Sequence, residues 1–526
     1  MSMTGFERSR EHYSPLRPRG RMWPLAVLFF ASFGDIVMAQ AGNQESVSQQ
    51  IQKLTDAMAA TQAELEQSQR QLNEMQQQLK ALQQQLGHNS PATAAPAITG
   101  PTTADSAATA AQLQSAVEEI REQQAMHESQ IATQEQAKVE SGSKYPVKIT
   151  GLLLMNSFVN TGAVDIGATP ALALPGPGSS GASVRQTILG FDARGPHLFG
   201  ASSYGNLRVD FDGAAQGSAG TTTYAGPYSA NAGLLRLRTA HAGLEWAHTE
   251  AYFSLDHPIF NPDTPTSLTA IAEPGLAWSG NLWTWNPQFG VKQKVPLSQR
   301  SDVELEAALI DVGDAPLTPI ITGSSTSAAE QSRWPGVEAH LAMAGTGLNA
   351  ESGNHFGLGG YFSPHRLFMG KEFDSWAATV DTRLLLPARL ELSGNIYRGL
   401  ALGGLGAGAL KDFVYRTDPD TGAYYVRPLD DVGGWAQLKE KINERVELNG
   451  AFGLDEGFGG EVRRYSVATG SMYQNLARNQ TFTGNVIYKP SASLLFSLEY
   501  RRLESFAELG SAAASNVIGL GAGFKF

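Results

Sequence analysis

The segment Leu494-Leu-Phe-Ser-Leu-Glu-Tyr-Arg-Arg502 decides the fold class of this chain. Its even-numbered positions from 494 to 500 hold Leu, Phe, Leu and Tyr, whereas Ser497, Glu499 and Arg501 stand between them. Successive side chains of a strand point to opposite faces, so this spacing predicts a strand with one apolar face and one charged face. The charged face is no less regular than the apolar one.

Sixteen segments of this kind follow one another from residue 146 to the end of the chain. The predicted strands are 146–161, 185–194, 203–212, 234–246, 249–256, 287–295, 302–310, 335–344, 353–362, 373–384, 388–398, 433–440, 444–453, 478–488, 492–502 and 515–526. The predicted long connections are 162–184, 213–233, 257–286, 311–334, 363–372, 399–432, 454–477 and 503–514. Short connections alternate with these long ones.

This alternation is typical of an outer-membrane barrel, because its periplasmic turns are tight and its extracellular loops are long. A soluble sandwich has no reason for a long loop at every second connection. We therefore predict an all-β fold, a 16-stranded antiparallel transmembrane β-barrel over residues 145–526 that encloses an aqueous channel. The last strand ends in Phe526, which resembles the C-terminal signature of bacterial outer-membrane proteins. A secreted soluble β-protein is the alternative.

Residues 1–41 are predicted to form a secretory signal peptide. Five arginines from Arg8 to Arg21 precede the apolar run Trp23–Phe33, and small residues around Ala39 offer cleavage sites. The run is too short to cross a bilayer as a helix, and no other apolar run approaches ~20 residues. A buried core helix is the alternative for this run.

Residues 42–86 carry a heptad pattern, with apolar side chains at alternating intervals of four and three. One seam at a spacing of seven consists of Ile51, Met58, Leu65, Leu72, Leu79 and Leu86. Such a sustained repeat predicts a coiled coil, placed in the periplasm by the barrel's orientation. Its flanking positions are mostly Gln, so they fix neither the partner helix nor the number of helices in the coiled coil. A single amphipathic helix packed on a domain is the alternative. Residues 87–144 are predicted to be a Pro/Ala linker and a second helical stretch.

The composition of the 526 residues narrows the chemistry. The chain has no cysteine, which excludes disulfide scaffolds, Cys-ligated zinc, iron–sulfur clusters and Cys nucleophiles. Its formal net charge of −11 argues against nucleic acid as a partner. The Gly-rich loop segment Gly403–Gly408 lacks the following Lys-Ser/Thr of a phosphate cradle, and no His-Glu-x-x-His or Gly-x-Ser-x-Gly motif occurs. We expect no enzyme activity, no metal and no cofactor.

The layout resembles trimeric sixteen-stranded porins with a periplasmic N-terminal coiled coil, the DcaP-like group, and more distantly the phosphate-selective OprP group. The resemblance is carried by the heptads, by Tyr145-Pro-Val-Lys-Ile-Thr-Gly151, by Asn206–Gly213, and by Leu235–Trp246, where basic residues precede His-Ala. It implies a homotrimer of barrels in the bacterial outer membrane, each with its own pore, and a third loop folded inward as a constriction. It also implies a preference for anionic solutes. The third long loop here departs from the family's expected pattern in being rich in Trp and Pro.

Basic side chains on the strands are the candidates for pore lining and selectivity. They are Arg208, Arg236, Arg238, Lys292, Lys294, Arg383, Arg389, Arg445 and Arg501. Arg236 and Arg238 stand two residues apart, so they point to the same side of one strand, where they would attract carboxylates or phosphates. Acidic residues share the inner face, as expected of any wet wall: Asp210, Glu250, Glu304, Glu306, Asp381, Glu391, Glu447 and Glu499. A pore with little charge preference therefore stays open as an alternative.

The predicted constriction loop holds a second set of candidates. They are Asp256, His257, Asp263, Glu273, Trp278, Trp283 and Trp285. Aromatic rings beside acids are compatible with a row of rings along which sugars pass, or with a belt of aromatic residues at the membrane interface. A third interpretation, which we favour, is that the rings pack the loop against the barrel wall.

These observations predict a porin, a passive diffusion channel for small hydrophilic solutes that prefers anions such as carboxylates. The expected partners are outer-membrane lipid, lipopolysaccharide, the solute and two further copies of the chain. A general or sugar porin is one alternative. A barrel-anchored tether, whose helices bind peptidoglycan, is another. An outer-membrane phospholipase needs a Ser and a His paired on the wall, and nothing in the sequence joins the available His241 and Ser497.

Overall fold

The computed structural model describes residues 145–213, 234–317, 326–345, 353–367, 370–465 and 472–526. The predicted signal peptide, coiled coil, linker and second helical stretch lie outside these residues. No helix in the described ranges is long and apolar enough to cross a membrane.

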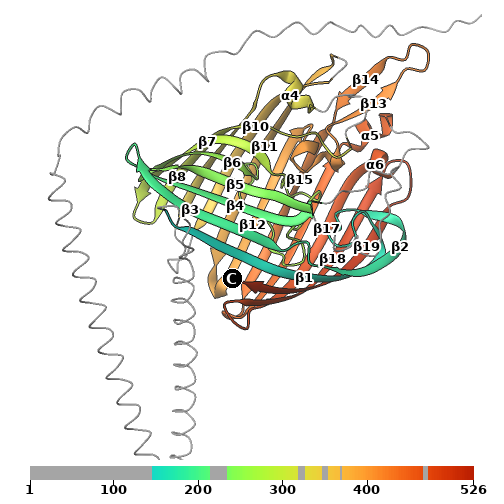
Figure 1. Cartoon of the computed structure of the whole chain (residues 1–526). Coiled ribbons are helices and arrows are strands. Elements are labelled where there is room, and N and C mark those ends of the chain that lie inside the picture. The colour runs from blue at the N-terminus through green and yellow to red at the C-terminus, as the bar shows by residue number, and fades with distance from the viewer. Residues whose placement is uncertain (1–144, 214–233, 318–325, 346–352, 368–369, 466–471) are drawn as a thin grey trace, which may run out of the picture. The chain divides into compact units, whose positions relative to one another are not determined.

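One antiparallel sheet forms the described body (Figure 1). Its strands are β1 (Val147–Val164), β2 (Ala173–Ser183), β3 (Ile188–Leu198), β4 (Ala201–Gly213), β5 (Leu234–Glu245), β6 (Thr249–Asp256), β7 (Asn286–Ser298), β8 (Ser301–Ile310), β9 (Gly336–Gly345), β10 (Asn354–Arg366), β11 (Glu372–Leu386), β12 (Leu390–Leu400), β15 (Asp430–Lys441), β16 (Val446–Gly457), β17 (Leu476–Tyr488), β18 (Leu494–Ala507) and β19 (Ala513–Lys525). A separate hairpin consists of β13 (Phe413–Thr417) and β14 (Tyr424–Pro428). The short helices are α4 (Ala328–Ser332), α5 (Gly459–Tyr465) and α6 (Met472–Asn475).

The sheet closes on itself because the first strand pairs with the last. The register of β1 and β19 runs from Leu152 opposite Lys525 to Asn160 opposite Val517. Gly151 and Phe526 exchange two backbone hydrogen bonds beyond this ladder, at 2.9 and 3.1 Å. In Figure 1 the colour therefore jumps from blue-green to dark red at this seam. Closure leaves no open sheet edge, which a strand wall in lipid requires.

Two of the seventeen strands share one place in the barrel. β2 pairs with residues 156–164 of β1, whereas β3 pairs with residues 147–152 of the same strand. The barrel therefore has sixteen positions, as predicted. The prediction of residues 162–184 as a loop was wrong, because β1 extends to Val164 and β2 occupies Ala173–Ser183. Its sequence, Ala-Leu-Pro-Gly-Pro-Gly-Ser-Ser-Gly-Ala-Ser, has no apolar alternation, so it gave no strand signal.

The predicted strand cores agree with the observed ones, but several strands are longer than predicted. The connections 367–371 and 508–512 are short for this reason, so long and short connections alternate less strictly than expected. The long connection between β12 and β15 contains the β13–β14 hairpin and two 3-10 turns, Gly403–Leu405 and Gly408–Leu410.

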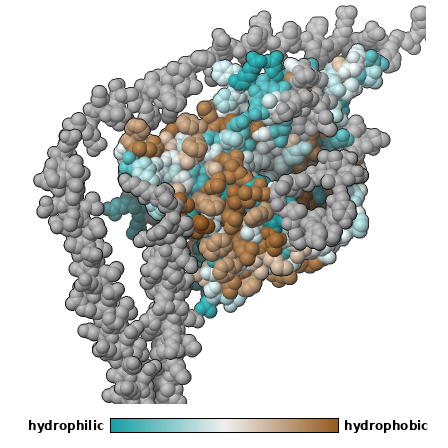
Figure 2. Space-filling view, viewed as in Figure 1, coloured by the Kyte–Doolittle hydropathy of each residue, from teal (hydrophilic) through white to brown (hydrophobic). Residues whose placement is uncertain are grey.

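The two faces of the wall differ in polarity as the alternation predicts. On the outward face Leu498 and Leu520 are 53% and 55% exposed, whereas on the inward face Glu499 and Arg501 are 1% and 6% exposed. Figure 2 shows the outward apolar side chains as a brown band across the strands. An outer surface of this kind matches the hydrocarbon region of a bilayer.

The buried apolar core lies inside the barrel, where loops pack against the wall. One cluster joins Phe260 and Leu282 of the β6–β7 loop to Leu402 and Leu405 of the β12–β13 loop and to Tyr397 of β12. Two inserted loops therefore fill part of the interior that the prediction assigned to an aqueous channel.

Candidate functional site

The loop between β6 and β7, residues 257–285, crosses the barrel and lies against its far wall. The Phe260 carbonyl accepts a hydrogen bond from Thr379 Oγ1 of β11 at 2.8 Å. Ser267 Oγ donates to Glu499 Oε2 of β18 at 2.6 Å. Further along, Asn479 of β17 donates to the Trp278 carbonyl at 2.8 Å. The loop therefore lies along the inner wall at β11, β17 and β18.

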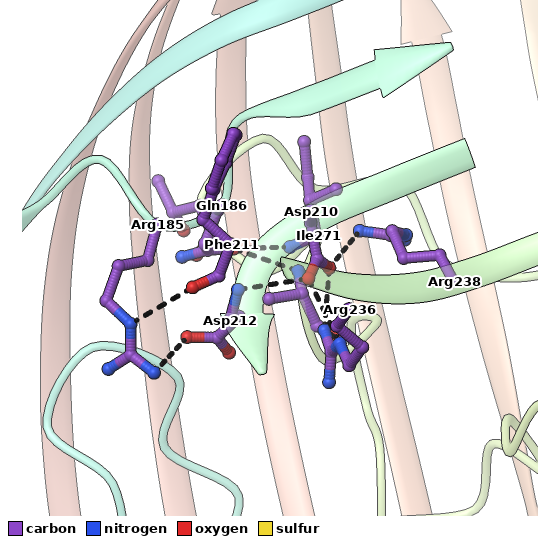
Figure 3. A network of polar contacts seen from close by, with 10 residues as sticks. Arg185, Gln186, Asp210, Phe211, Asp212, Arg236, Arg238 and Ile271 are labelled. Carbon is purple, nitrogen blue, oxygen red and sulfur yellow. Dashed lines mark hydrogen bonds and ion pairs between the residues drawn. The ribbon is translucent and has the colours of Figure 1, made fainter. Parts of the chain in front are cut away.

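Three guanidinium groups and two carboxylates form a cluster beside this loop (Figure 3). The Asp210 carboxylate is fully buried and accepts hydrogen bonds from Arg236 Nε at 3.0 Å and Arg236 Nη2 at 2.7 Å. Arg238 Nη1 lies 3.4 Å from the same carboxylate. Arg185 pairs with Asp212 at 3.2 Å. Three positive charges thus face two negative ones, and we call these five residues the arginine cluster.

A bulge in β5 brings Arg236 and Arg238 together. Arg208 of β4 lies opposite Thr239, but the next residue, Val209, lies opposite Leu237, so Arg238 is an extra residue in the ladder. Such bulges re-aim side chains. Both guanidinium groups lie over the Trp285 ring, 5.0 and 4.9 Å from its centre.

The constriction loop also holds the arginine cluster through its backbone. Arg236 Nη2 donates to the Ala272 carbonyl at 2.9 Å. Gln186 Oε1 accepts from the amides of Ile271 and Ala272 at 2.8 and 3.0 Å. Burial, together with the nearby carboxylates of Asp165 and Asp212, raises the pKa of the adjacent Glu273 to about 8. This shift favours the neutral carboxyl group, which adds no negative charge to the cluster.

The other predicted cations of the inner wall have carboxylate partners as well. Arg208 pairs with Asp192 at 2.7 Å. Lys292 and Lys294 share Glu304, at 2.7 and 3.0 Å. These pairs join neighbouring strands, so basic and acidic side chains alternate on the inner wall.

Two further predicted cations connect to buried acids. Arg501 Nε lies 3.0 Å from Glu499 Oε1 on its own strand. Arg383 forms an ion pair with Asp263 of the constriction loop. Asp263 also pairs with His355 at 3.2 Å, which anchors this part of the loop to β10 and β11.

Arg389 and Arg445 lie outside the barrel wall, so their prediction as wall residues was wrong. Arg389 belongs to the turn Pro387–Arg389, where Ala388 and Arg389 have φ of 61° and 60°. Arg445 stands in the turn before β16, and both side chains are exposed. The strands here start two residues later than predicted, because the tight turns use these residues.

The tryptophans of the loop pack against one another rather than forming an open row of rings. Trp278 and Trp283 are each 7% exposed. The Trp283 ring meets Trp278 and Trp285 edge-on, at 5.7 and 5.4 Å. At the start of the loop, His257 Nδ1 lies 2.6 Å from the Trp283 carbonyl, and burial lowers the pKa of His257. The His257 amide donates to Asp256 at 2.8 Å.

Sequence reasoning missed a second inserted loop, residues 401–412. Its backbone is held by three buried carboxylates: Asp412 accepts from the Gly404 amide at 3.1 Å, Asp431 from Gly408 at 2.9 Å, and Asp455 from Ala409 at 2.7 Å. Lys411 Nζ is buried and donates to two backbone carbonyls, at 2.9 and 2.6 Å. The uncharged run of Gly, Ala and Leu from 399 to 409 was the available signal.

A closed antiparallel barrel with an apolar outer face, a charged inner face and inward loops defines the porin class of fold. The chain is similar in structure to the outer membrane channel DcaP of Acinetobacter baumannii, with a TM-score of 0.55 and 15% sequence identity over 74% of this chain and 100% of that chain. This confirms the predicted resemblance at the level of the fold.

Two further solved structures have lower scores. OprB of Pseudomonas putida has a TM-score of 0.43 and 11% identity, covering 72% of this chain and 94% of that chain. The anion-selective porin from Comamonas acidovorans has a TM-score of 0.42 and 10% identity, covering 73% of this chain and 100% of that chain. Neither a family model nor a curated protein matches the chain.

Proposed function

We propose that this protein is an outer-membrane porin, a passive diffusion channel for small hydrophilic solutes with a preference for anions. The observation that carries the proposal is the combination of an apolar outward face with a charged inward face on a closed wall. A wall of this kind separates lipid from water, and solutes cross it without bond chemistry or a cofactor.

The anion preference rests on the arginine cluster. Arg236 and Arg238 remain 26% and 12% exposed to the interior, whereas Asp210 between them is fully buried. A passing solute therefore meets guanidinium groups and not the carboxylate that holds them. Guanidinium groups recognise carboxylates and phosphates with paired hydrogen bonds. Because most other cations of the wall are ion-paired, we expect a moderate preference rather than strict selectivity.

The assembly and location belong to the same proposal. The porin would be a homotrimer surrounded by outer-membrane lipid and lipopolysaccharide, exported by the signal peptide of residues 1–41. The coiled coil of residues 42–86 would stand in the periplasm and hold the three chains together.

Conductance and reversal potential across a planar bilayer test the proposal. The full mature chain in a KCl gradient is expected to give three equal conductance steps and an anion-biased reversal potential. Arg238→Gln should move the reversal potential toward zero. Arg366→Gln is the matched control, because Arg366 is an exposed partner of Glu372 at 3.6 Å, away from the cluster.

Other outcomes separate the alternatives. A cation-biased reversal potential would overturn the role of the arginine cluster. A large conductance without charge bias would favour a general or sugar porin. Correctly folded protein without conductance would overturn the channel and favour a tether between the outer membrane and the cell wall.

A further inference from the structure

The inner wall formed by β3, β4, β5 and β6 has an open cavity of about 280 Å³, which contains no residue of the arginine cluster. Its lining residues are Arg194, Tyr204, Asn206, His241, Glu245 and Glu250. Pockets for drug-sized ligands begin at about 300 Å³, so this cavity suits a solute of amino-acid size.

The acidic side of the cavity has unused hydrogen-bond acceptors. Glu250 Oε1 is the partner of both Tyr204 Oη and His241 Nε2, the latter at 3.2 Å. Glu250 Oε2 has no hydrogen bond or ion pair with any described residue. Glu245 is 55% exposed and has one ion pair, with Arg194 at 3.4 Å. Two carboxylates thus present free oxygens to the cavity.

The basic side has unused donors. The Arg194 side chain is 68% exposed, and its guanidinium group lies 5.7 Å from the centre of the Tyr204 ring. A guanidinium group has five N–H donors, of which the contact with Glu245 uses one. The side-chain amide of Asn206 makes no hydrogen bond within the described ranges, although it lines the cavity.

A stack of rings makes the floor of the cavity rigid. His241 lies between Tyr204 and Tyr252, with ring centres 5.6 and 4.6 Å apart. Tyr252 Oη donates to Glu306 at 2.6 Å, which fixes the end of the stack to β8. Because His241 is held on both faces, it keeps the Glu250 carboxylate in one position.

We propose that this cavity is a subsite for a small zwitterion of the α-amino acid class. The ligand carboxylate binds the guanidinium group of Arg194, and its ammonium group binds Glu250 and Glu245. An anion alone would leave its charge beside two carboxylates, and a cation alone would meet Arg194. A ligand with both charges satisfies both sides, so the arrangement discriminates by repulsion as well as attraction. The inference rests on the proposed function only in that solutes reach the cavity through the channel.

The cavity and the arginine cluster follow one another along β5. His241 lies three positions after Arg238, which corresponds to about 10 Å along a strand. A zwitterion that leaves the cluster therefore reaches the subsite about 10 Å further along β5.

Concentration-dependent block of the KCl current tests the subsite, with L-alanine, propionate and ethylamine as probes. Propionate lacks the ammonium group of L-alanine, and ethylamine lacks its carboxylate. We expect L-alanine to bind about tenfold more tightly than either, because only it pairs both charges. Glu250→Gln and Arg194→Gln should each weaken L-alanine binding about tenfold, whereas the exposed-pair control Arg366→Gln should leave it unchanged.

Equal affinity for the three probes, or unchanged L-alanine binding in both cavity variants, would overturn the subsite. If the protein still conducts KCl in that case, the proposed porin function stands. If the folded protein gives no KCl conductance, the proposed function fails. Calorimetric titration of L-alanine into the detergent-solubilised protein then decides the subsite alone: tenfold weaker binding in Glu250→Gln supports it, and no measurable heat overturns it.

Discussion

Trp283 joins the two loops that fold into the barrel, because its amide donates to the Leu405 carbonyl at 3.2 Å. Thr284 Oγ1 adds a second contact, to the Gly404 carbonyl at 2.9 Å. The constriction loop therefore rests on the β12–β13 loop as well as on the wall. The free space of the lumen depends on both loops.

Gly406→Ala should loosen this contact and raise the conductance. Gly406 has a φ of 102°, and an added Cβ would lie 2.7 Å from Trp283 Cδ1, so the substitution is both strained and crowded. Single-channel conductance in KCl measures the effect. Gly422→Ala is the matched control, since Gly422 has a φ of 67° but open space around it in an exposed turn. Equal effects of the two variants would mean that backbone strain alone matters.

Acid should stabilise the inserted loops. Burial raises the pKa of Glu273 to about 8 and that of Asp412 to about 7, above the ~4 of an unfolded carboxyl group. The folded state therefore binds more protons between about pH 4 and pH 8, so stability falls as the pH rises through this window. We expect the melting temperature of the solubilised protein to drop by a few degrees from pH 5 to pH 8.

Glu273→Gln and Asp412→Asn should each flatten that pH profile, because the amide stays neutral throughout. A wild-type melting temperature that rises from pH 5 to pH 8 would contradict the burial of these two groups.

Asp210→Asn should strengthen the anion preference and weaken the fold. The carboxylate holds Arg236 and Arg238, so its loss leaves two partly buried cations without their partner. The reversal potential in a KCl gradient should move further toward the anion value, and the urea midpoint should fall. Glu372→Gln releases Arg366 at the end of β10 and serves as the control, for which neither quantity should change.

A charged side chain on the outward face should lower the free energy of unfolding strongly only near the middle of a strand. Leu498→Arg is expected to cost about 2–4 kcal/mol of unfolding free energy in lipid vesicles, whereas Leu494→Arg, at the start of β18, should cost about 0–1 kcal/mol. Urea titration followed by tryptophan fluorescence gives both values. Similar costs at the two positions would mean that the wall does not meet hydrocarbon at Leu498.

The period-2 alternation of Leu494–Arg502 was enough to predict the wall, because lipid on one face and water on the other constrain every second residue. The same rule failed for β2, whose Pro, Gly and Ser residues show no alternation. A strand without large side chains can be found only through its backbone pairing with β1.

The site was less predictable than the fold. Sequence spacing predicted Arg236 and Arg238 on one side, but not the bulge at Arg238 or the buried carboxylate of Asp210 between them. Cross-strand partners depend on register, which a one-residue shift changes completely. The ion pair of Arg383 with Asp263 joins residues 120 positions apart, which no local pattern encodes.

The seam between β1 and β19 closes the wall with two strands that are far apart in the sequence. The Gly151 amide donates a backbone hydrogen bond to the Phe526 carbonyl at 2.9 Å. Closing a loop of this length costs more conformational entropy than any neighbouring hairpin, and folding dominated by such distant contacts is slow. Until β19 pairs with β1, the edges of β1 and β18 are open to pairing with other strands, which makes this stage of folding prone to mispairing.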